Sequence, residues 1–302
     1  MSHNRALPRP HHVNSETEAL ARYRALRPRL ISVAYSLLGS VEESEDAVQE
    51  AWLRLHRTPT GEITDITAWL VTTVSRLALD SLRSARRRRE EYVGEWLPEP
   101  LVDEADPADR VTLDESMSMA MLVVLETLSP AERTAFVLHD VFGLPFDEVG
   151  RVVGRSPAAC RQLAARARKH VTARAPRFDV GPDEHRRIVE AFLSAIRGGD
   201  MDGLVSLLDP DAVLRSDGGG AVRSALHPIL GARKVARFLL GIQARSAGLH
   251  ELRHAAVNGR PGLLGIRDGR TESVAAIAVS GGRISEIDIV LNPEKLKRTG
   301  PA

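Results

Sequence analysis

The sequence predicts a multidomain protein in which two all-α helical modules, the second with a helix-turn-helix, precede a C-terminal α+β domain. Apolar residues recur at spacings of three and four through residues 16–175, as in amphipathic helices. Short β-prone runs separated by glycines follow after position 210. The length of 302 residues fits two or three domains better than one.

Charge divides the chain further. The net charge of +1 conceals basic and acidic blocks that alternate along the sequence. The N-terminus is rich in proline, histidine and asparagine, which is typical of a disordered tail. The boundaries that we expect are 1–17 for this tail, 18–92 for the first helical module, 93–116 for an acidic linker, 117–175 for the second helical module and 176–302 for the C-terminal domain.

The whole-chain composition predicts a cytoplasmic protein. The single cysteine, Cys160, excludes an intrachain disulfide and indicates a reducing compartment. The N-terminus lacks the apolar segment of a signal peptide, and no apolar run is long enough to span a membrane.

The first module should contain three helices. The first ends at Gly39, and Ser40 can cap the second, which buries Val48 and Trp52. The other face of the second helix is acidic and polar, with Asp46, Gln49 and Glu50. The third helix begins near Thr67 and ends in a basic tract, since residues 76–89 hold six arginines against one aspartate. This excess favours contact with a nucleic-acid backbone over a solvated basic tract.

The acidic linker contains an apolar interruption. Residues 90–116 hold ten acidic residues and one basic residue, Arg110. The linker can be a self-repelling solvated tether or a nucleic-acid mimic that occupies a basic channel. Trp96, Leu97 and Pro98 lie among the acids, and we expect them to pack on another part of the molecule.

The second module carries the most informative segment, 146–171. Gly154 can end a short helix, and Ser156 can cap the next one with Pro157 at its first position. This second helix has an apolar face that includes Cys160. Its other face is basic or polar, with Arg161, Gln162, Ala165, Arg166, Arg168 and Lys169. Such a helix fits the DNA major groove, although an ordinary helical pair with a solvated basic face is the alternative. Upstream, Ser129 to Glu132 form a capping box.

The C-terminal domain should begin with helices and continue as a sheet. We expect helices over 183–199 and 201–208. We expect strands at 212–214, 263–266, 273–279 and 284–290, with a hairpin turn at 280–283. Helices followed by a curved meander describe a small α+β domain.

The order and spacing of several motifs resemble a bacterial extracytoplasmic-function (ECF) RNA polymerase sigma factor over residues 18–172. The motifs are Glu45–Trp52, Ala68–Leu70, Arg76–Arg83, Leu128–Phe136 and Phe146–Lys169. The resemblance implies a dissociable subunit that directs the polymerase core to specific promoters and initiates transcription.

The resemblance also implies roles for named residues. Asp46, Gln49 and Glu50 would bind the clamp helices of the largest polymerase subunit. The melted −10 strand would be bound by Arg76, Asp80, Arg83, Arg86 and Arg87, with Asp80 either reading a base edge or serving as a salt-bridge partner. Duplex at the −35 element would be read by Arg161 and Gln162 and held at its phosphates by Arg155, Arg166, Arg168 and Lys169. Ser156, at the start of the same helix, belongs to this −35 set.

The C-terminal residues resemble the SnoaL-like fold, a cone-shaped α+β domain that one subgroup of these sigma factors carries. Three motifs fit that subgroup, while Ala221 and Glu294 stand where the pattern has lysine and aspartate. The implied regulatory contacts are Trp96, Leu97 and Pro98 in the linker, Asp217, Gly218, Gly219 and Gly220, and Asn292, Pro293, Glu294, Lys295 and Leu296.

Docking onto the helical modules is the role that we expect for this domain, with a small ligand in the cone as a further possible partner. Its histidines show no metal or catalytic spacing, so we expect no catalytic residues, metal or cofactor. Two alternatives remain: a helix-turn-helix regulator that does not bind polymerase core, and a SnoaL-like enzyme with a DNA-binding arm.

Overall fold

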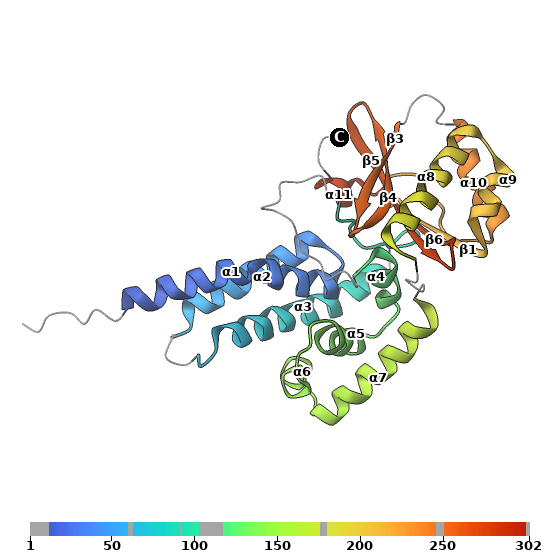
Figure 1. Ribbon diagram of the computed structural model, residues 1–302. Helices are drawn as coiled ribbons and strands as arrows, with labels where there is room; N and C mark the ends of the chain where they lie inside the picture. The colour runs from blue at the N-terminus through green and yellow to red at the C-terminus, as the bar shows by residue number, and fades with distance from the viewer. Residues whose placement is uncertain are drawn as a thin grey trace, which may run out of the picture.

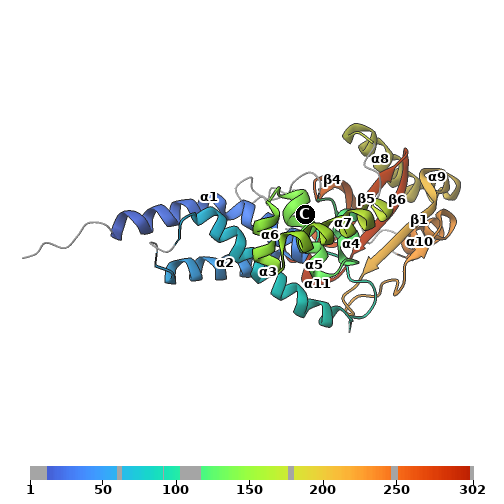
Figure 2. The same ribbon diagram turned by 90° about the horizontal axis from the view of Figure 1, so that it is seen from below.

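The computed structural model describes residues 12–59, 63–90, 92–102, 117–175, 180–245 and 251–299. Figures 1 and 2 show an elongated molecule with the helical modules at one end and the C-terminal sheet at the other.

Three helices lie side by side in the first module (Figure 1). They are α1 (His12–Leu38), α2 (Val41–Arg57) and α3 (Ile66–Glu90). Gly39 adopts a left-handed φ of 68° after α1, and the hydroxyl of Ser40 accepts a hydrogen bond from the Glu43 amide at the start of α2. Both predicted boundaries are therefore confirmed.

The predicted disordered tail of residues 1–17 is wrong in its last part, because α1 already begins at His12. Ala19 is buried in the core of the helical modules, and Tyr23 packs against that core. Packing of this first helical face extends α1 toward the N-terminus. Residues 1–11 lie outside the described part of the chain.

The second module is also helical. It consists of α4 (Met119–Glu126), α5 (Pro130–Phe136), the π-helical segment Val137–Val141, α6 (Phe146–Val153) and α7 (Pro157–Arg174). The capping box of Ser129 and Glu132 is present, with both reciprocal hydrogen bonds. Gly154, at φ 73°, ends α6, and the Ser156 hydroxyl accepts from the Ala159 amide at the start of α7. The helix-turn-helix is thus confirmed.

The two helical modules share one apolar core, which runs from Leu30 in α1 to Val171 in α7. Arg133 of α5 is 1% exposed and donates from Nε and Nη2 to the Ser36 carbonyl of α1, at 3.3 and 3.2 Å. Its Nη1 pairs with Glu126. A buried guanidinium thus satisfies a carbonyl near the end of α1 and joins the two modules.

The C-terminal domain combines four helices with a six-stranded sheet. The helices are α8 (Pro182–Gly198), α9 (Met201–Leu207), α10 (Ala232–Arg245) and α11 (Pro293–Leu296). The strands are β1 (Leu208–Asp217), β2 (Ile229–Leu230), β3 (Glu251–Val257), β4 (Arg260–Arg267), β5 (Arg270–Ser280) and β6 (Arg283–Val290).

The strand order is β2-β1-β6-β5-β4-β3. Strands β4 to β6 form an antiparallel meander as expected, β3 extends it, and the hairpin turn at Gly281 and Gly282 is confirmed. The sequence analysis missed β2, β3, α10 and α11. It also missed the parallel pairing of β1 with β6.

The two faces of this sheet are covered differently. The helix-covered face packs against α8, α9 and α10 through residues such as Leu214, Ile277 and Ile287. The linker-covered face, which includes Leu264 and Val290, packs against Leu97, Met119 and Leu296. Figures 1 and 2 show α8 to α10 on the side of the sheet away from α1 to α7. The linker-covered face is therefore where the C-terminal domain meets the helical modules.

Candidate functional site

The polar face of α2 is accessible. Asp46 and Gln49 are exposed, and Glu50 accepts a hydrogen bond from Arg54 at 2.8 Å. The opposite face is buried, with Val48 1% exposed and Ala51 fully buried. The apolar side of α2 thus belongs to the module core, while Asp46, Gln49 and Glu50 remain available to a partner.

The first turn of α2 is held by residues far away in the sequence. The Glu99 carboxylate accepts from the Val41 amide at 2.7 Å and from the Ser40 hydroxyl at 3.3 Å. Arg298, near the C-terminus, pairs with Glu45 at 2.6 Å and lies 3.9 Å from Glu99. Burial raises the pKa of Glu99, against the lowering effect of these hydrogen bonds. Glu99 and Arg298 were not among the expected contact residues.

Three of the residues expected at the −10 strand share an exposed face of α3. Arg76, Asp80 and Arg83 lie one and two turns apart, and Arg83 pairs with Asp80 at 3.1 Å. Arg76 instead donates to the Arg151 carbonyl of α6 at 2.8 and 3.2 Å. The basic face of α3 therefore lies beside the helix-turn-helix.

The side chains of the other two residues expected at the −10 strand are not described by the structure. Arg86 and Arg87 belong to the last part of α3, but their side chains lie outside the described part of the structure. Their assignment stays a prediction.

The second helix of the helix-turn-helix presents its basic side to solvent. Cys160 and Leu163 are buried, and they fix which face of α7 points outward. Arg161 lies over the Phe146 ring, 5.4 Å from its centroid, and remains exposed. The residues expected at the −35 element that are exposed are Arg155, Ser156, Arg161, Gln162, Arg166, Arg168 and Lys169.

Two of these arginines are anchored within the module. Arg166 pairs with Glu132 at 2.9 Å, and Arg168 pairs with Asp140 at 2.6 Å. Hydrogen bonding from Ser129, and then from Arg166, lowers the pKa of Glu132. Both arginines still have about half of their side-chain surface exposed, so they can reach a phosphate while their orientation is fixed.

A hydrogen-bonded cluster joins the linker to the C-terminal domain, and Asp217 lies at its centre. Asp217 is fully buried at the end of β1. Its carboxylate accepts from the Tyr92 hydroxyl at 2.6 Å, the Leu97 amide at 2.9 Å, Lys295 at 2.6 Å and the Gly219 amide at 3.0 Å. Four donors thus satisfy a carboxylate that burial alone would destabilise.

Lys295 completes this Asp217 cluster. Its ammonium also donates to the Leu97 carbonyl and lies 4.0 Å from the centroid of the Trp96 ring. The Tyr92 hydroxyl in turn accepts from Asn292 at 2.9 Å. Burial, followed by the hydrogen bond to Asp217, raises the pKa of Tyr92. Tyr92 was not among the expected residues.

The remaining residues of the three expected motifs lie at the margin of this cluster. A Cβ at Gly219, which has a φ of 64°, would lie 2.5 Å from the Asn292 side chain, so only glycine allows this approach. Pro293 and Glu294 are exposed, and Glu294 pairs with Lys297 rather than with the linker. Gly218 and Gly220 belong to the turn after β1, Pro98 packs over Gly39, and Leu296 is buried on the linker-covered face.

A second contact ties the linker to both neighbours. Tyr35 of α1 donates to the Glu99 carbonyl at 2.6 Å and accepts from Asn258 at 2.8 Å. The backbone amide of Asn258 donates to the Leu101 carbonyl at 2.7 Å, and Val102 forms an isolated β-bridge to Val257 of β3. The described linker, residues 92–102, therefore lies against both parts instead of forming a solvated tether. Residues 103–116 lie outside the description.

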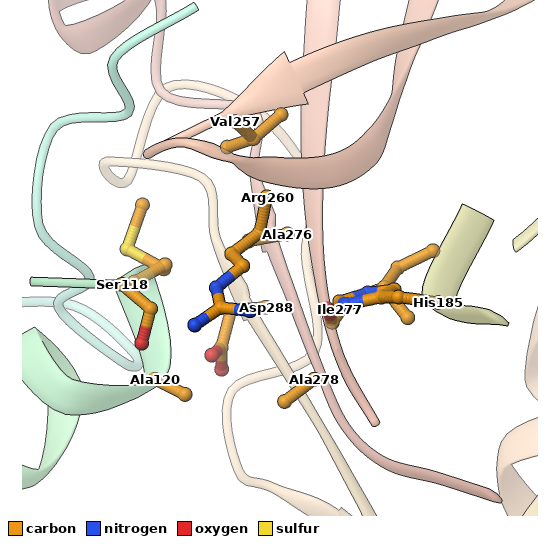
Figure 3. Close-up of a pocket in the computed structure, with 10 residues that line it drawn as sticks. Ser118, Ala120, His185, Val257, Arg260, Ala276, Ile277, Ala278 and Asp288 are labelled. Atoms are coloured by element: carbon orange, nitrogen blue, oxygen red, sulfur yellow. Dashed lines mark hydrogen bonds between the residues drawn. The ribbon is translucent and has the colours of Figure 1, made fainter. Parts of the chain in front are cut away.

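A small cavity occurs where α4 meets the linker-covered face. Figure 3 shows Arg260 and Asp288 between Ser118 and Ala120 of the α4 start and the strands of the sheet. The cavity has about 20 Å³, enough for a single water. Arg215 donates to Asp288 at 3.0 Å from this face of the sheet, and Asp288 is 2% exposed. Burial raises the pKa of Asp288 to about 6 against the attraction of Arg215.

The described residues offer no metal-binding group and no membrane-spanning helix. They contain no group of histidine, cysteine or acidic side chains arranged to hold a metal ion. On the helix-covered face, Phe192, Leu204, Val235 and Ile277 pack together, and a ligand in the cone stays a prediction. Within the described part of the chain, no helix combines the length and apolar character needed to cross a membrane.

Comparison with known proteins gives matches to both helical modules. Residues 22–88 match the family Sigma-70 region 2, and residues 118–171 match Sigma-70, region 4.

Similarity to curated relatives extends into the C-terminal domain. The chain is 45% identical over 292 residues to the ECF RNA polymerase sigma factor SigJ of Mycobacterium tuberculosis, covering 91% of this chain and 92% of the relative. It is 37% identical over 279 residues to the probable ECF RNA polymerase sigma factor SigI of the same species, covering 91% and 94%. The crystal structure of M. tuberculosis SigJ superposes with a TM-score of 0.75 at 42% identity, covering 91% and 97% of the two chains.

Proposed function

The chain belongs to the ECF family of RNA polymerase sigma factors, and on this premise we propose which of its surfaces meet the polymerase core and the promoter. As a sigma factor it directs RNA polymerase to specific promoters and takes part in transcription initiation. We assign residues 18–92 to region 2, 93–116 to a linker, 117–175 to region 4 and 176–302 to a regulatory domain.

The polymerase core binds the polar face of α2. The observation that supports this role is the division of α2 into a buried apolar face and an exposed face with Asp46, Gln49 and Glu50. Acidic and amide groups at helical spacing suit a charged helical partner, the clamp helices of the largest polymerase subunit.

Charge reversal tests this assignment. Asp46→Lys combined with Glu50→Lys should abolish binding to polymerase core in a pull-down, while the far-ultraviolet circular dichroism remains unchanged. Asp183→Lys, an equally exposed change in the first turn of α8, is the control and should bind normally. Unchanged core affinity of the double variant contradicts the assignment.

Promoter DNA meets α3 and α7. Arg161 and Gln162 lie near the start of α7 and read base edges, while Arg155, Arg168 and Lys169 hold phosphates. The −10 strand follows the exposed face of α3 that carries Arg76, Asp80 and Arg83, continuing to Arg86 and Arg87. The support for these roles is the outward position of basic side chains on both helices.

Base-reading and phosphate-binding roles give different mutant behaviour. Arg161→Ala should relax sequence preference at one promoter position and cost about 1–3 kcal/mol there. Lys169→Ala should weaken all promoter variants alike and lower the salt dependence by about one counterion. If the two variants behave alike across a set of promoter variants, the roles are wrongly assigned.

The C-terminal domain regulates the sigma modules by docking. Its main support is the Asp217 cluster, in which one buried carboxylate binds the linker at Tyr92 and Leu97. Because Asp217 is covered by the linker, it serves as a docking residue rather than as a catalytic acid. Run-off transcription by polymerase core, with the full chain and with residues 1–175, tests the regulation: equal promoter output from both would contradict it.

A further inference from the structure

The corner between α1 and α2 receives contacts from three distant parts of the chain. Glu99 of the linker binds the Val41 amide, and Glu99 itself is only 6% exposed. Arg298 reaches the acids beside this turn, Glu45 and Glu99. Asn258, after β3, donates to the Tyr35 hydroxyl of α1, and that hydroxyl donates to the Glu99 carbonyl. The linker and the C-terminal domain thus converge on the α1–α2 corner of region 2.

The chemistry of this turn explains why Glu99 needs Arg298. A carboxylate at a helix N-terminus is attracted by the unpaired amides and the helix dipole. Burial disfavours the charged form of this carboxylate, and the Arg298 guanidinium, 3.9 Å away, offsets part of that cost.

Ser40 alone caps this turn poorly. Its hydroxyl lies 3.4 Å from the Glu43 amide, a long hydrogen bond, whereas Glu99 lies 2.7 Å from the Val41 amide. Glu99 is also fixed through its backbone, since its amide donates to the Gly39 carbonyl at 2.8 Å. The linker residue therefore fixes both sides of the α1–α2 corner.

We propose that Glu99 is a positioning residue for polymerase binding: it holds the first turn of α2, and through it the C-terminal domain sets the position of Asp46, Gln49 and Glu50. Asp46 lies in the second turn of α2, so a change at Val41 reaches it through a continuous helix. The inference rests on the proposed role of α2 in core binding. It concerns the full chain, because Arg298 and Asn258 supply the contacts from the C-terminal side.

Full-length Glu99→Ala and Glu99→Gln provide the test, read by hydrogen exchange of the Val41 and Glu42 amides and by affinity for polymerase core. Glu99→Ala should lower amide protection about 2- to 30-fold, the range for loss of a helix cap, and should weaken core binding by a similar factor. Glu99→Gln retains an acceptor for the Val41 amide and should recover most of both properties. Glu132→Ala removes the capping carboxylate of α5 and should leave α2 exchange unchanged.

Arg298→Ala keeps the inference testable if Glu99→Ala fails to fold, because Arg298 is about half exposed. It should lower protection of the same amides about twofold at low salt. Unchanged α2 exchange in both Glu99→Ala and Arg298→Ala overturns the inference. Increased exchange with unchanged core affinity also overturns it, since Glu99 would then be only structural.

The outcome is separable from that of the proposed function. If Asp46→Lys and Glu50→Lys leave core binding intact, the assignment of α2 itself is wrong. If those changes abolish binding while Glu99→Ala leaves it intact, the assignment holds and the positioning role fails.

Discussion

The two faces of the C-terminal sheet differ in how they are covered. The helix-covered face joins α8, α9 and α10 through aliphatic and aromatic side chains. The linker-covered face has an apolar cluster too, but it also buries Asp217 and Asp288, at 0% and 2% exposure. Apolar packing tolerates rearrangement, whereas a buried carboxylate needs each donor in place. The first face therefore stabilises the domain, and the second specifies how it docks.

The largest effect should follow removal of the central carboxylate from the linker-covered face. Asp217→Ala removes the buried carboxylate that accepts from Lys295, the Tyr92 hydroxyl and the Leu97 amide. Breaking a buried ion pair costs about 3–5 kcal/mol, and we expect this loss in the free energy of unfolding measured with denaturant. Glu294→Ala, an exposed change in α11, is the control. Equal stabilities of the two variants would show that the Asp217 cluster contributes little.

A deletion on the helix-covered face should act on the domain rather than on docking. Ile287 is 1% exposed among the side chains of that core. Ile287→Ala should lower the free energy of unfolding by about 3 kcal/mol through lost burial and a cavity. Hydrogen exchange should then increase throughout β5 and β6, without selective loosening of the linker. Selective loosening at Leu97 would erase the distinction between the two faces.

A smaller effect should be a pH dependence of the free energy of unfolding, caused by Asp288 on the linker-covered face. The pKa of Asp288 is raised from 3.8 to about 6, chiefly by burial, with Glu286 beside it and Arg215 opposing. The folded state therefore binds the Asp288 proton more tightly than the unfolded state does. The stabilisation from this proton is lost as pH rises through the folded pKa. The contribution of Asp288 to the free energy of unfolding should rise by about 1.4 kcal/mol as pH falls from about 7 to about 5.

Asp288→Asn isolates that contribution, since the amide cannot ionise. The difference in free energy of unfolding between wild type and variant should change with pH over this range, while the same difference for Glu251→Gln, an exposed acid on β3, should stay constant. Parallel pH profiles for wild type and Asp288→Asn would contradict the raised pKa.

Local signals made the helical modules predictable from sequence. Gly39, Gly154 and Ser156 act through their own backbone or through amides three residues away, and all three were found at helix boundaries as expected. Helix α10 was missed although Ala232, Val235, Ala236 and Leu239 have helical spacing, because the residues after position 210 were interpreted as β-prone runs. The start of α1 at His12 was missed because the composition of residues 1–17 is typical of a disordered tail. The burial of Ala19 depends on tertiary packing, which composition does not show.

The candidate site was predictable only in part. The motifs placed Trp96, Asp217 and Lys295 in one region, and the structure brings them together in the Asp217 cluster. Glu99 and Asn258 could not be paired with Tyr35, because a hydrogen bond between residues 223 positions apart leaves no periodic signal. The parallel pairing of β1 with β6 is likewise set by the whole domain rather than by either strand.

The C-terminal domain holds the linker in place through the Asp217 cluster. Hydrogen exchange of the Leu97 amide in the full chain and in residues 1–175 tests it directly, because that amide donates to Asp217 in a fully buried position. We predict that truncation lowers its protection at least about tenfold while α6 and α7 keep theirs. Equal protection of Leu97 in the two proteins would contradict the account.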